Sequence, residues 1–143
     1  TNKNKEKMGR VFFNTRKNVH AITTTYQALA SDSGKVFTLD AAGGLYTFTL
    51  PTVANALDGW NCKFIVGEHT PTAVITIAAE GAIMHGYSED ITADIGIGTN
   101  GTAVTNLIVG VSAAQGDTIE LVCDGTLWYF KQLSQVSGSV TTS

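Results

Sequence analysis

Apolar and polar residues alternate most regularly between residues 117 and 123. There Ile119, Leu121 and Cys123 fall on one side of the alternation, and Thr118 and Glu120 fall on the other. Consecutive side chains of a β-strand point to opposite faces of its sheet, so this spacing predicts a strand that is buried on one face.

A second alternating run follows directly, with Trp128 and Phe130 on one face and Tyr129 on the other. Asp124-Gly125 separates the two runs and is a strong hairpin signal, because a type I′ turn requires positive φ at both central residues. The pattern therefore predicts a closing hairpin whose large aromatic side chains help to build the core.

The same criteria predict further strands along the chain. These cover residues 18–29, 36–39, 45–50, 60–66, 73–78 and 106–111, with a short strand near Ile83 and Met84. Residues 53–59 have the character of one helical turn, residues 87–105 are predicted as a long loop, and residues 134–143 as a Ser/Thr-rich tail of low complexity.

About eight to ten short strands with frequent turn signals are typical of a sandwich or a small barrel. We predict an all-β fold: a single β-sandwich, or a tulip- or jelly-roll-like domain, with an extended N-terminal arm. The expected boundaries are 1–17 for the arm, 18–133 for the β domain and 134–143 for the tail. A chain of 143 residues suits one such domain.

Charge is distributed unevenly along the chain. Residues 1–17 hold six cations against one acid and carry a net charge of +5, whereas residues 18–143 hold three cations against eleven acids and carry −8. A basic arm on an acidic body is typical of a protein that binds a partner. We predict the partner-binding residues to be Lys3, Lys5, Lys7, Arg10, Phe12, Phe13, Arg16 and Lys17.

The two phenylalanines form an apolar patch within the arm, which is expected to anchor it to its own domain or to a partner. For the first seven residues a solvated tail is the alternative interpretation. Nucleic acid is not the expected partner, because no stacking platform accompanies the arm and an acidic body repels phosphates. No long apolar run predicts a membrane span, and no secretory signal is expected.

Candidate catalytic and metal-binding chemistry is sparse. His20, His69 and His85 lack metal-ligand spacing, and Cys62 and Cys123 form no C-x-x-C motif. Both cysteines occupy apolar positions of predicted strands; they are expected to be buried free thiols, with a disulfide as the alternative. We predict no metal, no cofactor and no enzymatic activity.

Three other short sequence patterns resemble known binding or modification motifs. Glu89, Asp90 and Asp94 lack the spacing of a calcium loop and are expected to form a solvated acidic loop. Gly96-Ile97-Gly98 lacks the helix of a dinucleotide-binding fingerprint, and Asn100-Gly101-Thr102 is a glycosylation triplet of the kind that arises by chance.

The order of the turns and strands resembles small virion proteins of tailed bacteriophages, namely capsid decoration and head-fibre-type minor structural proteins. The resemblance covers residues 27–133. Its segments are SGKVFTL, AGG before LYTFTLP, the strand of residues 60–66, AVITIA with Gly86 beyond it, and GDTIELVCDGTLWYF. The resemblance implies an all-β domain, commonly trimeric, that acts by binding.

Two functional hypotheses follow from the arm and the resemblance. The first is a decoration (cement) protein on the outside of the phage head, which binds the major capsid protein through its basic arm. The alternative is a head-fibre or tail-fibre domain for host-surface or carbohydrate recognition, with residues 87–105 as its contact surface.

Overall fold

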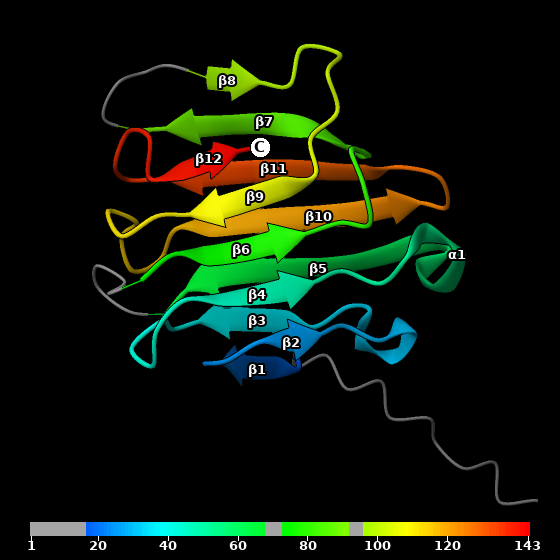
Figure 1. Ribbon diagram of the computed structural model, residues 1–143, viewed down its shortest axis with the longest axis horizontal. Coiled ribbons are helices and arrows are strands. Elements are labelled where there is room, and N and C mark those ends of the chain that lie inside the picture. Colours follow the sequence, from blue (N-terminus) through cyan, green and yellow to red (C-terminus); the bar gives the residue numbers. More distant parts are fainter. Residues whose placement is uncertain (1–16, 68–72, 92–95) are drawn as a thin grey trace, which may run out of the picture.

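Two β-sheets pack face to face in the structure, a computed structural model that describes residues 17–67, 73–91 and 96–143 (Figure 1). The seven-stranded sheet has the order β1 (Val19–Ile22), β3 (Val36–Leu39), β5 (Asp58–Val66), β10 (Thr118–Asp124), β11 (Trp128–Ser134), β7 (Met84–Asp90) and β8 (Gly96–Gly98). The five-stranded sheet has the order β12 (Val140–Thr142), β9 (Asn106–Val109), β6 (Ile75–Ala78), β4 (Tyr46–Thr49) and β2 (Tyr26–Gln27). The predicted all-β sandwich is confirmed.

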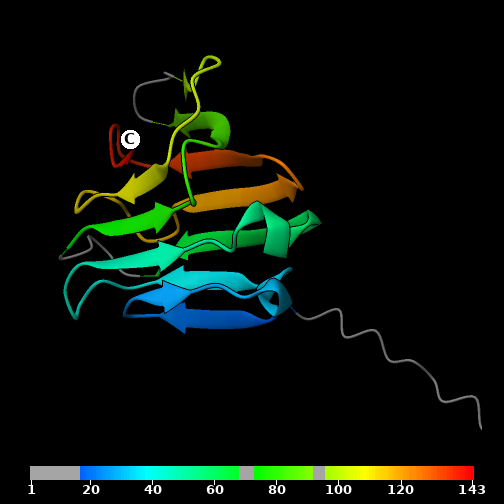
Figure 2. The ribbon, with the colours of Figure 1, turned by 45° about the vertical axis from the view of Figure 1, so that its right-hand side comes forward.

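The first six strands alternate between the two sheets, so this part of the chain winds helically and crosses from one sheet to the other after each strand (Figure 2). Successive strands within each sheet are parallel: β1 with β3 and β3 with β5 in one, and β2 with β4 and β4 with β6 in the other. The remaining pairs are antiparallel except β11 with β7. The parallel pairs distinguish this sandwich from an antiparallel jelly roll.

Aromatic side chains from both sheets meet in the core. Phe48 of β4 lies 4.8 Å from Phe37 of β3 and 4.8 Å from Phe64 of β5, measured between ring centroids, and all three rings are buried. At the other side of the core Trp60 and Trp128 pack edge to face at 5.3 Å. Burial of these rings supplies a large part of the hydrophobic stabilisation.

The strongest sequence patterns are reproduced. In β10 and β11 the predicted inward residues are buried and Tyr129 is exposed, and β4 and β5 show the expected alternation. The single helical turn is α1 (Val53–Ala56), and a 3-10 turn, η1 (Ala30–Asp32), precedes β3.

The turn between β10 and β11 differs from the prediction. Its central residues are Gly125 and Thr126, because the Asp124 N–H donates to the Leu127 carbonyl at 3.1 Å. Of these two central residues, Gly125 alone has a positive φ, at 88°. This is the pattern of a type II′ turn and not of a type I′ turn. The Asp124 carboxylate accepts the N–H groups of Thr126 at 2.8 Å and of Leu127 at 2.7 Å, and thereby closes the turn.

Three predicted segments are wrong. Residues 18–29 form two short strands, β1 and β2, in different sheets. The predicted loop of residues 87–105 contains most of β7 and all of β8. The predicted tail of residues 134–143 contributes β12, which pairs with β9, and Ser139 within it is buried. Except for β8, which pairs with the adjacent β7, these strands pair with partners that are distant in sequence.

Cys62 and Cys123 are both buried and unpaired. Burial raises the pKa of both thiols, which keeps them in the unreactive protonated form. A thiol reagent is therefore expected to leave the native protein unmodified and to label two cysteines per chain in denaturant. Mass spectrometry measures the labelling, and unlabelled denatured protein would indicate a disulfide.

Asp32 is a buried carboxylate that organises the chain before β3. It accepts hydrogen bonds from Lys35 Nζ at 2.5 Å, Leu29 N–H at 2.8 Å and Tyr26 OH at 3.0 Å. Burial alone would raise the pKa of the Asp32 carboxyl, but these hydrogen bonds outweigh it and hold the pKa below its ordinary value.

Because the pKa is lowered in the folded state, the ionised Asp32 stabilises the fold above the carboxyl pKa of the unfolded chain, about 3.9. This contribution is lost as the pH falls below that value. Asp32→Asn is expected to lower the free energy of unfolding by about 2 kcal/mol at pH 7. Urea unfolding should show this difference shrinking toward pH 3. Glu120 provides the control, because its ion pair with Lys63 is exposed to solvent. Glu120→Gln is therefore expected to change the free energy of unfolding little. A difference of equal size at both pH values would contradict the prediction.

Candidate interaction surfaces

Of the residues predicted to bind a partner, Lys17 alone falls within the described part of the chain, where it is exposed. It lies two residues before β1, so the basic segment joins the sandwich at the β1 strand. The other predicted residues lie outside the described residues: Lys3, Lys5, Lys7, Arg10, Phe12, Phe13 and Arg16.

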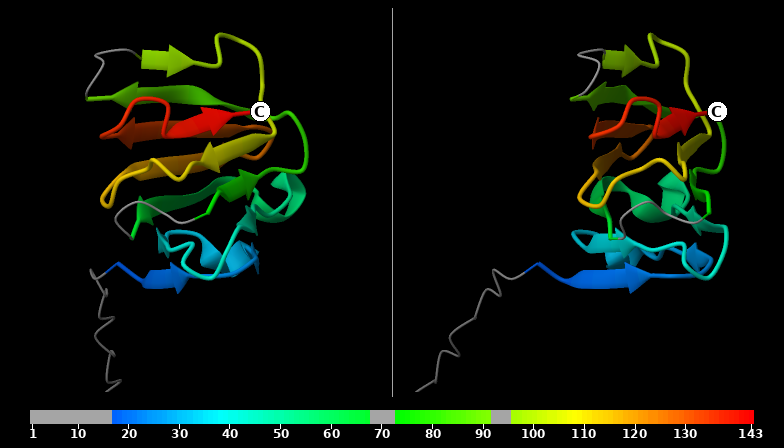
Figure 3. Two further views of the ribbon diagram at one scale, coloured as in Figure 1. Left: turned by 60° about the vertical axis from the view of Figure 1, so that its left-hand side comes forward. Right: turned by 90° about the vertical axis from the view of Figure 1, so that its left-hand side faces the viewer.

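Both sheets end in an edge strand where the basic segment joins. β1 is the last strand of the seven-stranded sheet and β2 the last strand of the five-stranded sheet, and they lie at the same end of the sandwich (Figures 1 and 3). Within the described residues each strand pairs on one side only. An edge strand presents backbone N–H and C=O groups that another chain can pair with.

The outer face of the five-stranded sheet is uncharged. In the ladder register, Thr47, Thr76, Ile108 and Thr141 form one row across four strands, and a second row lies beside it. The second row consists of Gln27, Thr49, Ala78 and Asn106. A broad face of uncharged side chains suits packing against another protein surface, because no charge needs to be desolvated.

The outer face of the seven-stranded sheet is charged by contrast. Lys63 Nζ lies 3.8 Å from Glu120 Oε1, and Glu120 is paired across the strands with Lys131. All three side chains reach solvent, so this face is compatible with exposure to water.

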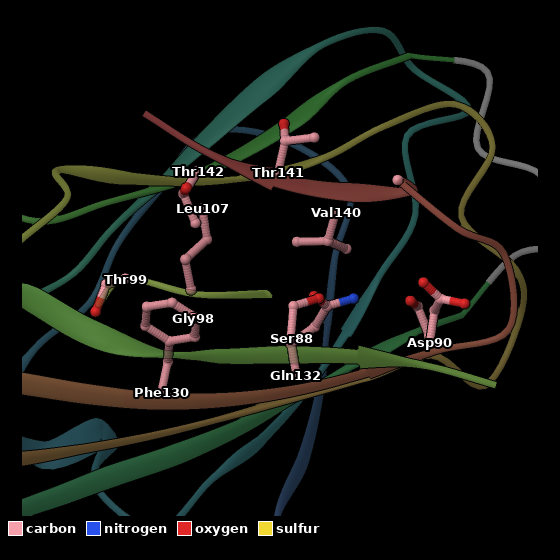
Figure 4. A pocket seen from close by; sticks show the side chains of 12 residues that line it. Ser88, Asp90, Gly98, Thr99, Leu107, Phe130, Gln132, Val140, Thr141 and Thr142 are labelled. Atoms are coloured by element: carbon pink, nitrogen blue, oxygen red, sulfur yellow. The ribbon is translucent and has the colours of Figure 1, made fainter. Parts of the chain in front are cut away.

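A cavity of about 230 Å³ lies between the sheets at the opposite end from β1. There β7 and β8 extend beyond β12, the edge of the five-stranded sheet (Figure 3). In Figure 4, Phe130, Gln132 and Ser88 reach into the cavity from β11 and β7, and Leu107 and Val140 reach into it from β9 and β12.

Gln132 is the unusual residue of this cavity. Its side chain is 1% exposed, and Ser88 Oγ donates a hydrogen bond to its Oε1. Its Nε2 has no hydrogen-bond partner among the described residues. Gln132 occupies an inward position of β11, two residues after Phe130. If the predicted alternation is extended from Phe130 to Ser134, it identifies Gln132 as a polar residue that faces the core.

The residues considered for metal binding do not come together in the described part of the chain, where no cluster of three His, Cys, Asp or Glu side chains is present. His20 packs against the rings of Tyr26 at 5.3 Å and Phe37 at 6.0 Å. Glu89 and Asp90 belong to β7 and not to a loop, while His69 and Asp94 lie outside the described residues.

Comparison with known proteins identifies no family. No protein-family model and no curated protein matches the chain. Among the described helices, none is both long enough and apolar enough to cross a bilayer.

Proposed function

We propose that the chain is a structural protein of a tailed-bacteriophage virion, a decoration protein that binds the outer surface of the head and stabilises the shell. The resemblance of residues 27–133 to such proteins suggests this role. The observation that carries the proposal is the position of Lys17, which joins the basic segment to the end of the sandwich where β1 and β2, among the described residues, each pair on one side only.

At that end two kinds of interaction act on the same partner, the major capsid protein. The cations attract an acidic surface over a range of about 10 Å, and the strand edges offer backbone hydrogen bonds once contact is made. Phe12 and Phe13 supply apolar anchors close to the cations in sequence. A protein that binds several subunits of the assembled shell, but not the separate subunits, stabilises the assembled state by linkage.

The decoration protein is proposed to act as a homo-oligomer, with a trimer favoured by the resemblance. The uncharged outer face of the five-stranded sheet supports this, because a second copy can cover it without desolvating a charge. The charged outer face of the seven-stranded sheet then remains in water.

Deleting residues 1–17 is expected to abolish binding to phage heads that lack decoration, measured by co-sedimentation. Changing the six cations of the segment to Gln, with Phe12 and Phe13 retained, separates charge from apolar contact. That variant is expected to bind weakly and to lose the salt dependence of the intact protein. Circular dichroism should show an unchanged β domain in both variants. Capsid binding by the deletion variant at wild-type affinity would remove the proposal.

The alternative, a fibre domain for host-surface or carbohydrate recognition, is supported by one observation. Ser88 and Asp90, from the predicted contact segment of residues 87–105, line the cavity beside β12. A cell-binding assay separates the two functions, since a protein that acts only as cement binds capsid and not the host surface.

A further inference from the structure

The cavity beside β12 has the size of a site for a small molecule. Its volume of about 230 Å³ corresponds to roughly eight water molecules at liquid density. It is smaller than sites for drug-sized ligands, which occupy roughly 300–1,000 Å³. A ligand that fills it is therefore no larger than about one sugar ring.

The walls of this cavity are held by the fold before any ligand arrives. Gly86 of β7 forms two hydrogen bonds with Thr99. The Thr99 N–H donates to the Gly86 carbonyl at 2.9 Å, and the Gly86 N–H donates to Thr99 Oγ1 at 3.3 Å. Phe130 lies beside Gly86 in the parallel pair of β11 and β7. Such a preformed site costs little ordering on binding.

The polar group at the centre of the cavity is incompletely satisfied. Gln132 is almost fully buried, yet one of its amide atoms has no partner in the described part of the chain, while the other accepts a hydrogen bond from Ser88. A buried amide without a partner is costly and rare in native proteins. Either orientation of the amide leaves one polar atom toward the cavity, and a hydroxyl group suits both, because it donates and accepts hydrogen bonds.

The remaining walls restrict the class of ligand further. Phe130, Leu107 and Val140 present apolar surface, which matches the C–H face of a sugar ring. Neither lysine nor arginine is among the described residues that line the cavity, so an anion such as phosphate or a carboxylate would lose its hydration there without a compensating cation. Hydroxyl groups on an otherwise apolar ring satisfy all of these requirements.

We propose that the cavity between β11, β7 and β12 is a binding site for a neutral polyhydroxylated ligand, a single sugar residue, with the Gln132 amide as its central hydrogen-bonding group. This site is at the opposite end of the sandwich from Lys17, so it does not depend on the decoration function. It uses the same cavity that supports the alternative fibre function, but it requires only that the isolated domain binds a sugar.

The test uses the full chain labelled with ¹⁵N and titrated with D-glucose, D-galactose and N-acetyl-D-glucosamine. At least one of these sugars is expected to shift the side-chain NH₂ resonances of Gln132 and the backbone resonances of Ser88 and Val140 in a saturable manner. Acetate and inorganic phosphate are expected to leave them unchanged. If none of the three sugars shifts these resonances, the cavity holds water only and the proposal is overturned.

Two variants locate the binding. Gln132→Met keeps the length of the side chain but removes the amide, and should weaken sugar binding about tenfold. Its control is Gln27→Met on the outward face of β2, which should bind like wild type. Val140→Phe fills the cavity from β12 and should abolish the shifts. Wild-type affinity in either folded cavity variant would overturn the proposal, and if both fail to fold, the wild-type titration decides.

Because the readout is the isolated protein, its failure leaves the capsid-binding proposal untouched. Equally, loss of capsid binding on deleting residues 1–17 would not alter the sugar titration. Equal shifts with acetate or phosphate would overturn the assignment of a neutral ligand.

Discussion

Replacing Phe48 with Ala is expected to lower the free energy of unfolding by about 3–5 kcal/mol, the largest effect of any single change considered for this protein. Phe48 is fully buried on β4, and its ring packs against those of Phe37 and Phe64 from the opposite sheet, each at 4.8 Å, and against Tyr26 at 5.3 Å. Removing the ring opens a cavity at the contact between the two sheets, which rigid strands on both sides cannot collapse to fill.

Equilibrium urea unfolding measures this loss. Leu45→Ala is the matched control, because Leu45 immediately precedes β4 but is 80% exposed, and its truncation should change the stability by less than about 0.5 kcal/mol. A loss below about 1 kcal/mol in Phe48→Ala would contradict the central role of the aromatic cluster.

The second large effect is expected for Gly86→Ala, which should cost about 3 kcal/mol or more. A Cβ atom built on Gly86 lies 2.0 Å from the Phe130 carbonyl oxygen and 2.7 Å from Phe130 Cγ. The oxygen belongs to the backbone of β11, so it cannot move aside as a flexible side chain would. The parallel pair of β7 and β11 must therefore separate locally, which also deforms the wall of the cavity.

Gly81→Ala is the control for this substitution. A Cβ on Gly81 meets no atom within 4 Å, and Gly81 is not among the glycines with positive φ. Gly81→Ala should leave the stability unchanged or raise it by up to about 1 kcal/mol, because alanine restricts the unfolded chain. Urea unfolding of both variants gives the comparison, and equal stabilities would show that β7 and β11 accommodate a side chain at Gly86.

Individual strands with a strict alternation were predictable from the sequence. The inward residues of β5, from Trp60 to Val66, and of β10, from Ile119 to Cys123, were identified because the period of a strand is a local property. One buried face also fixes which side chains point to the core, since a shift by one residue would expose all of them.

Segments with weaker patterns were not predictable in this way. β12 consists of Val140, Thr141 and Thr142, a composition that also fits a tail, and it is a strand because β9 offers an open edge beside it. Residues 18–29 have the composition of one strand, but the chain crosses from one sheet to the other after Ile22, so they form two strands. In both cases the partner is distant in sequence, where a local pattern carries no information.

The cavity illustrates the same limit for the candidate site. It is assembled from β7, β8, β9, β11 and β12, which span residues 84–142, and no motif joins them. Its single local signal is Gln132, a polar residue at an inward position of a strand whose other inward residues include Trp128 and Phe130.

The sequence by itself determined the class of this protein: an all-β domain with an aromatic core, because alternation and turn residues act within a few positions of one another. It also determined the separation of charge between residues 1–17 and the acidic remainder. Only the tertiary structure decided the order and direction of the strands, the uncharged outer face of the five-stranded sheet and the cavity around Gln132. These depend on contacts between segments far apart in the chain, and their energies are set by packing and hydrogen bonding that exist only once the two sheets have come together.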